Sequence, residues 1–228
     1  MKYNNIYEGI FLERPNRFIA NVLIDGKKEK VHVKNTGRCK EILIKGTKVY
    51  LEKSNNPNRK TKYSLISAYK GNQLINIDSQ VPNKVVFDAV QSNKIEGLNN
   101  IKVLKREVTF GNSRFDLYFE KDNEKGFIEV KGVTLEDNGL SLFPDAPTER
   151  GTKHIKEMIK AVEFGLSGFI FFLIQMENIK YFTPNISMDE KFSNALIEAN
   201  KRGVNILAYN SIVKKDFIKI NEKIEVLI

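Results

Sequence analysis

The sequence has one cysteine, two histidines and no long apolar segment. Because Cys39 has no partner cysteine, an internal disulfide and a zinc site built from cysteines are excluded, and a reducing cytoplasm is the expected compartment. His32 and His154 are too few for a histidine-rich metal site. The longest apolar run, residues 169–174, is far shorter than the ~20 residues that span a bilayer, and residues 1–5 carry no apolar segment of the signal-peptide kind. We therefore expect a soluble protein without a membrane partner.

The sequence also lacks a glycine-rich phosphate loop, a G-x-S-x-G nucleophile motif and an internal repeat. It does have an uneven distribution of charge. Residues 1–80 contain 16 Lys and Arg against 7 Asp and Glu, a net charge of +9, whereas residues 81–228 contain 21 of each kind. A basic segment beside a neutral one is typical of a surface that meets a polyanion such as DNA. The alternative is a composition in which lysine is simply abundant.

Residues 1–81 are predicted to form a small β-barrel. Short runs rich in β-branched and aromatic residues alternate with turns, and Asp25-Gly26 is a hairpin signal. The predicted strands cover residues 9–13, 17–24, 29–33, 47–53, 62–69 and 73–77, with a short helical turn over residues 36–43. Five or so short strands favour an OB-fold, and the pattern alone would suit an SH3-like barrel equally well.

The cations of this barrel segment fall mostly in loops and at strand edges, where they suit contacts with phosphates and hence binding without sequence specificity. The candidate nucleic-acid-binding residues are Arg14, Arg17, Lys34, Arg38, Arg59, Lys60 and Lys62. The candidate platforms for stacking bases are Phe11, Phe18, Tyr50 and Tyr63. Each of these aromatic residues is more often found in a core than on a binding surface.

Residues 82–228 are predicted to form a second domain built on a mixed sheet, because helical and strand patterns alternate along them. The first predicted helix has residues 85, 86, 89 and 90 on one face and ends before Gly97, and the other two cover residues 147–165 and 189–202. The predicted strands cover residues 104–110, 113–120, 127–132, 168–175, 204–209 and 217–227. Residues 134–145 are predicted to be a loop. The unbroken apolar run at residues 168–175 indicates a central strand that is buried on both faces.

The centre of this domain is a predicted β-hairpin at residues 113–132, in which a charged turn ending in glycine separates two strands. Strand alternation places Phe115, Leu117 and Phe119 on one face. The same rule places Asp116 and the pair Glu129 and Lys131 together on the other face.

Two carboxylates that converge from adjacent strands repel each other, and a hard divalent cation with oxygen ligands relieves this repulsion. Such a site favours phosphodiester hydrolysis, because the metal polarises a phosphoryl oxygen and lowers the pKa of a bound water. Lys131 would then hold that water or screen the developing charge. The alternative is a cross-strand ion pair on a solvated face, which stabilises by less than ~1 kcal/mol. Spacing alone slightly favours the ion pair.

The predicted helix at residues 147–165 offers supporting groups. Arg150, His154 and Glu157 share one face, from which Arg150 would clamp a phosphate if the face points to the hairpin, and Lys153 or His154 would assist at the strand ends. The alternative is an ordinary helix surface with an ion pair between Lys153 and Glu157.

Asp116 followed by Glu129-Val130-Lys131 resembles the D…(D/E)-x-K motif of the PD-(D/E)XK nuclease superfamily, whose active sites bind magnesium. A longer set of segments resembles the sugar fermentation stimulation protein A (SfsA) family, over residues 9–209. These segments are residues 106–108 (R-E-V), 113–116 (S-R-F-D), 129–135 (E-V-K-G-V-T-L), 143–146 (F-P-D-A) and 150–154 (R-G-T-K-H). The family usually has asparagine where this chain has Gly132, a departure that leaves the proposed ligands untouched. The resemblance implies an OB-fold followed by a PD-(D/E)XK nuclease-like domain.

Two main functional hypotheses follow from this resemblance. In the first, the protein binds DNA without sequence specificity and hydrolyses it with Mg²⁺ or Mn²⁺. The expected ligands are Asp116, Glu129 and the carbonyl of Val130, with Lys131 as the catalytic cation. The secondary candidates are Glu107, Arg114, Arg150, Lys153 and His154. In the second, the protein is a non-catalytic DNA-binding regulator of sugar (maltose) metabolism, and Asp116, Glu129 and Lys131 form an internal ion-pair network. A third, weaker hypothesis makes RNA the ligand.

Overall fold

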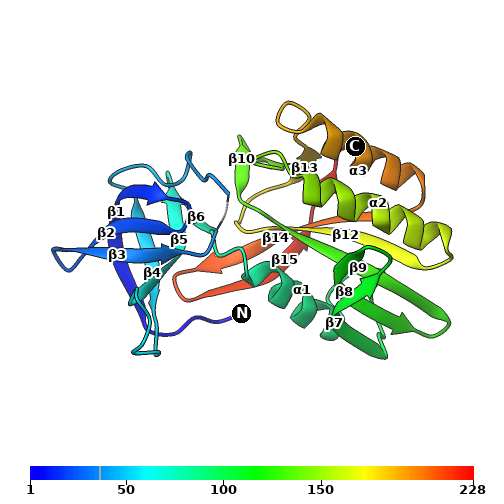
Figure 1. The fold of residues 1–228 in the computed structure, drawn as a ribbon, viewed down its shortest axis with the longest axis horizontal. Coiled ribbons are helices and arrows are strands. Elements are labelled where there is room, and N and C mark those ends of the chain that lie inside the picture. Colours follow the sequence, from blue (N-terminus) through cyan, green and yellow to red (C-terminus); the bar gives the residue numbers. More distant parts are fainter. Residues whose placement is uncertain (36) are drawn as a thin grey trace.

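The computed structural model describes residues 1–35 and 37–228 and has two lobes side by side (Figure 1). The first lobe is the barrel drawn in blue and cyan. The second holds the three helices and the remaining strands. The C-terminus lies on this lobe, and the N-terminus lies between the two lobes. The last barrel strand ends at Asn76 and the first helix begins at Val81, so the predicted boundary falls at the start of that helix.

The first lobe is a closed barrel. Its strands are β1 (Ile6–Asn16), β2 (Ile19–Ile24), β3 (Lys27–Val33), β4 (Lys48–Lys53), β5 (Tyr63–Lys70) and β6 (Gln73–Asn76). They pair in the order β3-β2-β1-β4-β5-β6, and an additional β3–β5 pairing closes a barrel of five strands. Asp25 and Gly26 both have positive φ, +48° and +76°, as a two-residue hairpin turn requires. The predicted barrel is therefore confirmed.

The predicted helical turn at residues 36–43 is one turn long. The amide of Leu43 donates a hydrogen bond to the carbonyl of Cys39 at 2.9 Å, which is the spacing of a helical turn. Thr36, where the prediction began, lies outside the described residues.

The second lobe is built on a mixed sheet. Its strands are β7 (Val103–Phe110), β8 (Ser113–Lys121), β9 (Glu124–Val133), β12 (Ser167–Ile174), β14 (Asn205–Lys214) and β15 (Phe217–Lys223). They lie in the order β15-β14-β12-β9-β8-β7, with β12 parallel to both of its neighbours. The residues of β12 beyond Ser167 are buried, which confirms that the apolar run at residues 168–175 is a central strand.

Three helices cover the two faces of this sheet. Helix α1 (Val81–Gln91) packs on the face that presents Leu117 and Ile128. Helices α2 (Glu149–Glu163) and α3 (Glu190–Lys201) pack on the opposite face. Thr148 caps α2 and Asp189 caps α3, since each side chain accepts a hydrogen bond from an amide in the first turn, and Gly203 follows α3 with φ +87°.

The prediction of a loop at residues 134–145 is wrong. The chain forms a hairpin of β10 (Leu135–Asp137) and β11 (Leu140–Phe143), which a small sheet extends through β13 (Tyr181–Pro184) and β16 (Glu225–Val226). Asn138 and Gly139, with φ +50° and +85°, make the turn. Asn-Gly is a strong hairpin signal, but strands of three and four residues are too short to show an alternating pattern.

Polar contacts join the two lobes. Asn76, at the end of the barrel, exchanges hydrogen bonds with Gln175, at the end of β12: Asn76 N donates to Gln175 O at 2.9 Å, and Gln175 Nε2 donates to Asn76 Oδ1 at 2.9 Å. The Lys70 ammonium pairs with the Glu136 carboxylate on β10. These partners come from strand ends, so the barrel is seated on the edge of the second lobe.

None of the helices in the described part of the chain is both long enough and apolar enough to cross a membrane.

Candidate metal and nucleic-acid site

Strands β8 and β9 separate at the predicted catalytic residues. Their ladder runs from the Lys121–Glu124 pair to the Leu117–Ile128 pair and stops there. Asp116 and Glu129 would be the next pair of that ladder. Instead, the amide of Val130 donates a hydrogen bond to Oδ2 of Asp116 at 2.8 Å. The carboxylate of Asp116 therefore takes the place of a backbone carbonyl, and it lies at the point where the two strands part.

The neighbouring strand β7 explains this orientation of Asp116. Glu107 has φ +55°, in the left-handed region that is uncommon for residues other than glycine, and the β7–β8 ladder omits the Glu107–Asp116 pair. As a result Phe115 packs with the cluster around α2 and α3, whereas Leu117 and Phe119 pack with the cluster around α1. The prediction that Phe115 shares a face with Leu117 and Phe119 is wrong, because regular alternation breaks at this position.

Glu129 is held by two cationic or protonatable groups. Its Oε1 accepts a hydrogen bond from Lys131 Nζ at 2.6 Å and lies 2.5 Å from Nδ1 of His154. Its Oε2 is buried and has no hydrogen-bond partner among the described residues. Burial opposes ionisation of Glu129, but the charge of Lys131 and the hydrogen bonds from His154 and Lys131 outweigh it, so its pKa is lowered.

Asp116 has the opposite shift. Burial first, and the charge of Glu129 second, raise the pKa of Asp116 to about 6. The hydrogen bonds that Asp116 accepts from the Val130 amide and from Nδ2 of Asn83, at 2.8 and 2.6 Å, only partly offset this effect. Two carboxylates whose pKa values are displaced in opposite directions thus lie where the β8–β9 ladder ends. Perturbed pairs of this kind are typical of functional sites.

The groups at this end of the ladder suit a hard divalent cation. Asp116 and Glu129 offer carboxylate oxygens as metal ligands. Oε2 of Glu129 is buried and has no hydrogen-bond partner among the described residues, so it is available to ligate a metal ion. Across residues 1–35 and 37–228 no three His, Cys, Asp or Glu side chains gather as a ready metal cage. Two carboxylates, completed by a backbone carbonyl such as that of Val130 and by water, fit Mg²⁺, which keeps several of its waters.

The secondary candidates divide into two groups. His154 contacts Glu129, whereas Arg150 and Lys153 are both exposed on α2. Glu107 and Arg114 are exposed and pair with each other at 3.5 Å. The roles of all five stay predictions.

The predicted common face of Arg150, His154 and Glu157 does not correspond to one environment. His154 and Glu157 are buried, whereas Arg150 is exposed. Glu157 accepts a hydrogen bond from the amide of Asn112 at 3.1 Å and pairs with Lys160 at 2.6 Å, in place of the alternative pair with Lys153. Glu157 therefore ties α2 to the β7–β8 turn.

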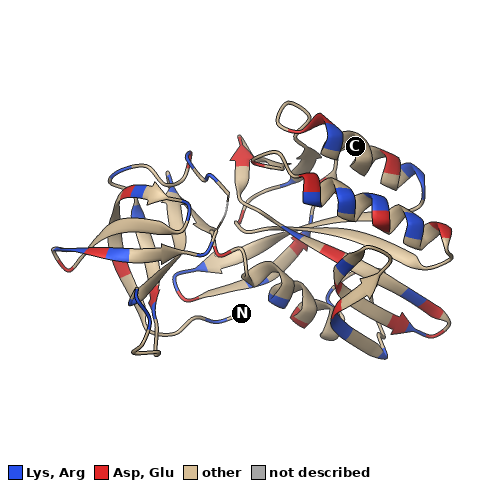
Figure 2. Ribbon diagram, viewed as in Figure 1, with Lys and Arg blue, Asp and Glu red and all other residues tan. Residues whose placement is uncertain are grey.

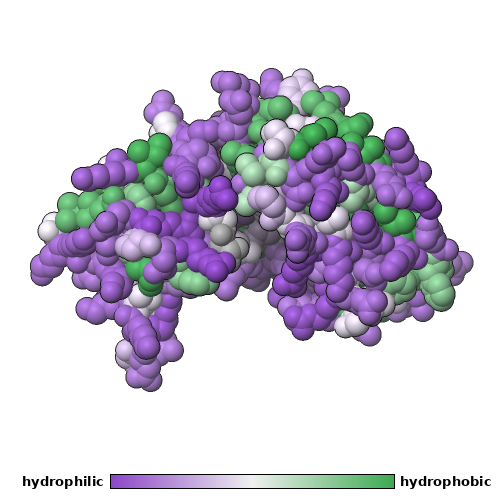
Figure 3. Space-filling model, turned by 45° about the horizontal axis from the view of Figure 1, so that its top comes forward, coloured by the Kyte–Doolittle hydropathy of each residue, from purple (hydrophilic) through white to green (hydrophobic). Residues whose placement is uncertain are grey.

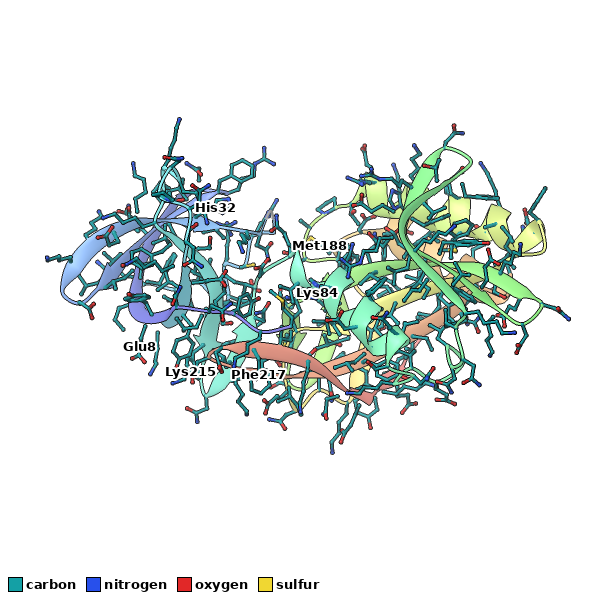
Figure 4. The ribbon with its side chains drawn as sticks, turned by 90° about the horizontal axis from the view of Figure 1, so that it is seen from below. Glu8, His32, Lys84, Met188, Lys215 and Phe217 are labelled. Carbon is teal, nitrogen blue, oxygen red and sulfur yellow. The ribbon has the colours of Figure 1, made fainter. Side chains whose placement is uncertain are left out.

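The other histidine lies elsewhere. Figure 4 places His32 in the barrel lobe, where burial, and then the charges of Arg59 and Lys34, lower its pKa. His32 therefore makes no contribution to the carboxylate site.

The predicted nucleic-acid-binding cations of the barrel lie in different settings. Arg14 donates hydrogen bonds to four backbone carbonyls, those of Arg17, Asn35, Gly37 and Arg38, at 2.6 to 2.9 Å. Lys34 pairs with Asp78 at 3.2 Å, and Arg59 donates to Ser64 Oγ at 3.1 Å. The exposed members of the set include Arg17 and Arg38, and Lys60 and Lys62 lie in the loop before β5. Figure 2 shows that basic residues are spread over the loops and strands of the barrel.

The four candidate stacking residues also differ in exposure. Phe11 and Tyr50 are buried in the cores, and Tyr63 is partly buried and packs edge-on against Tyr7, with ring centroids 5.2 Å apart. Phe18 is 49% exposed, so it has a ring surface available to a base.

Two residues at the site were not predicted from the sequence. Asn83 orients Asp116 from the first turn of α1. Gln175 lies against Gly132, where an added Cβ would clash with the Gln175 amide oxygen, so Gln175 fills the space that a side chain at position 132 would need. Neither residue belongs to a local pattern, because Asn83 is 33 positions from Asp116 along the chain.

Two family models match the chain. Residues 80–217 match the family described as the sugar fermentation stimulation protein RE domain, and residues 12–77 match the SfsA N-terminal OB domain. The chain belongs to the SfsA family. The match of residues 12–77 also decides between the two barrel types, and the predicted OB-fold is confirmed.

Relatives cover nearly the whole chain. A sugar fermentation stimulation protein homolog from Alkaliphilus oremlandii is 57% identical, over 99% of this chain and 98% of the relative. A homolog from Clostridium tetani is 54% identical over 98% of each chain. The solved structure of Pyrococcus furiosus SfsA in complex with Ca²⁺ is 30% identical and superposes with a TM-score of 0.91, covering 100% of this chain and 98% of that chain. The predicted combination of an OB barrel with a mixed-sheet domain is thus confirmed.

Proposed function

We propose that this protein is a metal-dependent phosphodiesterase that binds DNA without sequence specificity and cleaves it at the opening between β8 and β9. The observation that carries the proposal is the pair of carboxylates where β8 and β9 part, the partly buried Asp116 and the buried Glu129, of which Glu129 has an oxygen without a partner among the described residues. The Pyrococcus furiosus relative was solved in complex with Ca²⁺, a cation that prefers oxygen ligands as Mg²⁺ does.

The residues of the site have separate tasks in this proposal. Asp116, Glu129 and the Val130 carbonyl would hold Mg²⁺ or Mn²⁺, which supplies a polarised phosphoryl oxygen and a water of lowered pKa. Lys131, whose Nζ is 2.6 Å from Glu129, presents its ammonium group to the negative charge that develops on the phosphate. His154 and Asn83 hold Glu129 and Asp116 in place through the hydrogen bonds they make.

The barrel supplies binding in this proposal. Loop cations such as Lys60 and Lys62 contact phosphates and therefore carry affinity without reading base sequence. The positive excess of the chain lies entirely within residues 1–80, so binding and chemistry are assigned to different lobes.

The test is cleavage of end-labelled single- and double-stranded DNA with Mg²⁺, Mn²⁺ or EDTA. We expect metal-dependent products from the unmodified protein, and their loss in Asp116→Ala, Glu129→Gln and Lys131→Ala, with DNA binding nearly intact. Lys125→Ala is the matched control for Lys131→Ala, because Lys125 is an exposed lysine of the same strand. If the Asp116 and Glu129 variants still cleave DNA, the assignment of the catalytic metal site to these two residues is contradicted.

A second candidate function is a DNA-binding regulator of sugar metabolism without catalysis. The observation in its favour is that Lys131 and His154 both pair with Glu129, so the protein's own groups compensate the charge of this carboxylate. In this case DNA binds but no metal ion supports cleavage. RNA in place of DNA is tested by repeating the assay with an RNA strand of the same sequence.

A further inference from the structure

A cavity of about 380 Å³ lies where the two lobes meet. Arg17 from the barrel and Ser79 from the connection to α1 line it on one side, and Thr134 and Asp145 line it on the other. Gly132 also lines it and is next to Lys131 in the chain, so the cavity adjoins the strand β9 that carries two of the proposed catalytic residues. Figure 3 shows the recess between the two lobes from outside. We refer to this space as the junction cleft.

Hydrogen bonds hold the two sides of the junction cleft together. The amide of Arg38, on the barrel, donates to Oδ2 of Asp145 at 3.2 Å. Gln175 Nε2 bonds Asn76 Oδ1 at 2.9 Å and the carbonyl of Asp78 at 3.2 Å. These contacts between described residues flank the cleft, so it does not widen without breaking them.

An exposed aromatic residue stands beside the cleft. Phe18 follows Arg17 in the turn between β1 and β2 and is 49% exposed. The guanidinium carbon of Arg17 lies 5.3 Å from the centre of the Phe18 ring. An exposed ring with a stacked guanidinium is the kind of surface on which proteins stack unpaired bases, since every base has a flat face.

The two carboxylates next to the cleft differ in exposure. Glu129 is 2% exposed, with the His154 ring beside it 7% exposed, whereas Asp116 is partly buried. Duplex DNA is a stiff rod that carries its phosphates on the outside of two paired strands. A cleft of this volume and with fixed sides accommodates a single flexible strand and excludes that rod.

We propose that the substrate of this site is a single-stranded polynucleotide, with one base stacked on Phe18 and the backbone passing through the junction cleft to Asp116 and Glu129. The inference rests on the proposed function and adds the strand state of the substrate to it. The duplex is expected to meet the exposed cations of the barrel without reaching the carboxylates.

The test measures binding and cleavage separately. Fluorescence anisotropy in EDTA compares a labelled single-stranded DNA, an RNA of the same sequence and a blunt DNA duplex, and Mg²⁺ is then added to follow cleavage. We expect the single strands to bind more tightly than the duplex. Phe18→Ala is expected to weaken single-strand binding by about 5- to 150-fold, the range measured for loss of one stacked base, and to leave duplex binding unchanged.

Two further variants complete the design. Phe164→Ala is the matched control, because Phe164 is a 79% exposed ring at the end of α2, outside the cleft lining. It is expected to change neither affinity. Phe18→Tyr keeps the ring and is expected to restore single-strand binding, which separates stacking from a general effect on folding.

The outcomes distinguish the two proposals. A duplex that binds and is cleaved as well as the single strand, or a Phe18→Ala variant that weakens both equally, overturns the strand preference and leaves the nuclease proposal standing. Single-strand preference that depends on Phe18, without cleavage in any metal, supports the cleft inference for binding and overturns the nuclease. DNA and RNA strands that bind equally support recognition by stacking and backbone contacts rather than by the sugar.

Discussion

The two lobes use charge in different ways. Residues 1–80 carry a net charge of +9, and several of their cations are exposed in loops, whereas residues 81–228 are neutral overall. The polar groups of the proposed site in the second lobe are largely covered: Lys131 Nζ and His154 Nδ1 lie 2.6 and 2.5 Å from the Glu129 carboxylate on β9. Net charge therefore predicts that a polyanion would meet the first lobe, and it carries no information about the carboxylates of the second lobe.

The largest effect is expected on the rate of cleavage, from a substitution of Lys131 that leaves DNA binding nearly unchanged. Lys131→Ala is expected to lower Mg²⁺-dependent cleavage by about 100-fold or more, because it removes the partly buried cation that we propose stabilises the developing charge on the phosphate. DNA affinity is expected to change by less than about 2-fold, since the cations proposed to bind DNA lie on the barrel. The measurement pairs single-turnover cleavage with anisotropy. Equal losses of DNA binding and cleavage would contradict the assignment of binding to the barrel and of cleavage to the second lobe.

The next largest effect is expected on stability, at Arg14, a cation of the barrel whose guanidinium bonds backbone carbonyls. Arg14→Ala is expected to lower the free energy of unfolding by about 2 to 4 kcal/mol, because it leaves the backbone carbonyls of Asn35, Gly37 and Arg38 without their donor. Urea unfolding measures this. The exposed Arg38 is the control, and Arg38→Ala is expected to cost no more than about 0.5 kcal/mol. If the Arg14→Ala variant is as stable as the unmodified protein but binds DNA more weakly, the result would support a DNA-binding role for Arg14 instead.

Asp116 sets a pH dependence in the second lobe. Its pKa is about 6 in the folded protein, above the ordinary value of 3.8, so between these values the folded state binds more protons and the free energy of unfolding falls as pH rises. Asp116→Asn removes this fall. The stability of the variant minus that of the unmodified protein is expected to increase by at most about 3 kcal/mol between about pH 4 and 7.

The slope of this difference is the informative quantity for Asp116→Asn. Asn83 and the Val130 amide both donate to Asp116, and asparagine has one acceptor oxygen, so the absolute stability also changes. Urea unfolding at several pH values in EDTA measures the slope. A difference that stays constant with pH would show that Asp116 is not the group that titrates.

The smallest effect is expected at the loop cations of the barrel. Replacing Lys60 and Lys62 with glutamine is expected to weaken binding of single-stranded DNA about 3- to 10-fold at low salt and to reduce the salt slope by about 1.4, if each lysine meets one phosphate. Affinity as a function of salt concentration is the measurement. Lys125→Gln, on the second lobe, is the control and is expected to leave the slope unchanged. An equal reduction in the control would contradict binding by the barrel.

Part of the fold could be predicted because local patterns are strong where packing is regular. The barrel strands, the buried run at residues 168–175 and the helix that Gly203 follows were all predictable from alternation, apolar runs and turn residues. The hairpin of β10 and β11 was missed because its strands are too short to show a period. Phe115 was assigned to the wrong face because the left-handed backbone at Glu107 is not visible in the alternation.

The sequence by itself determined the two-lobe plan, the asymmetry of charge and the short stretch that carries Asp116, Glu129 and Lys131, since these depend on residue order and composition alone. The tertiary structure decided that β8 and β9 part at Asp116, that Asn83 and His154 orient the carboxylates, and that Arg14 serves the barrel loop. The physical reason is that hydrogen-bond partners and desolvation come from residues far apart in the chain, so they exist only after the helices pack on the sheet and the barrel is seated on its edge.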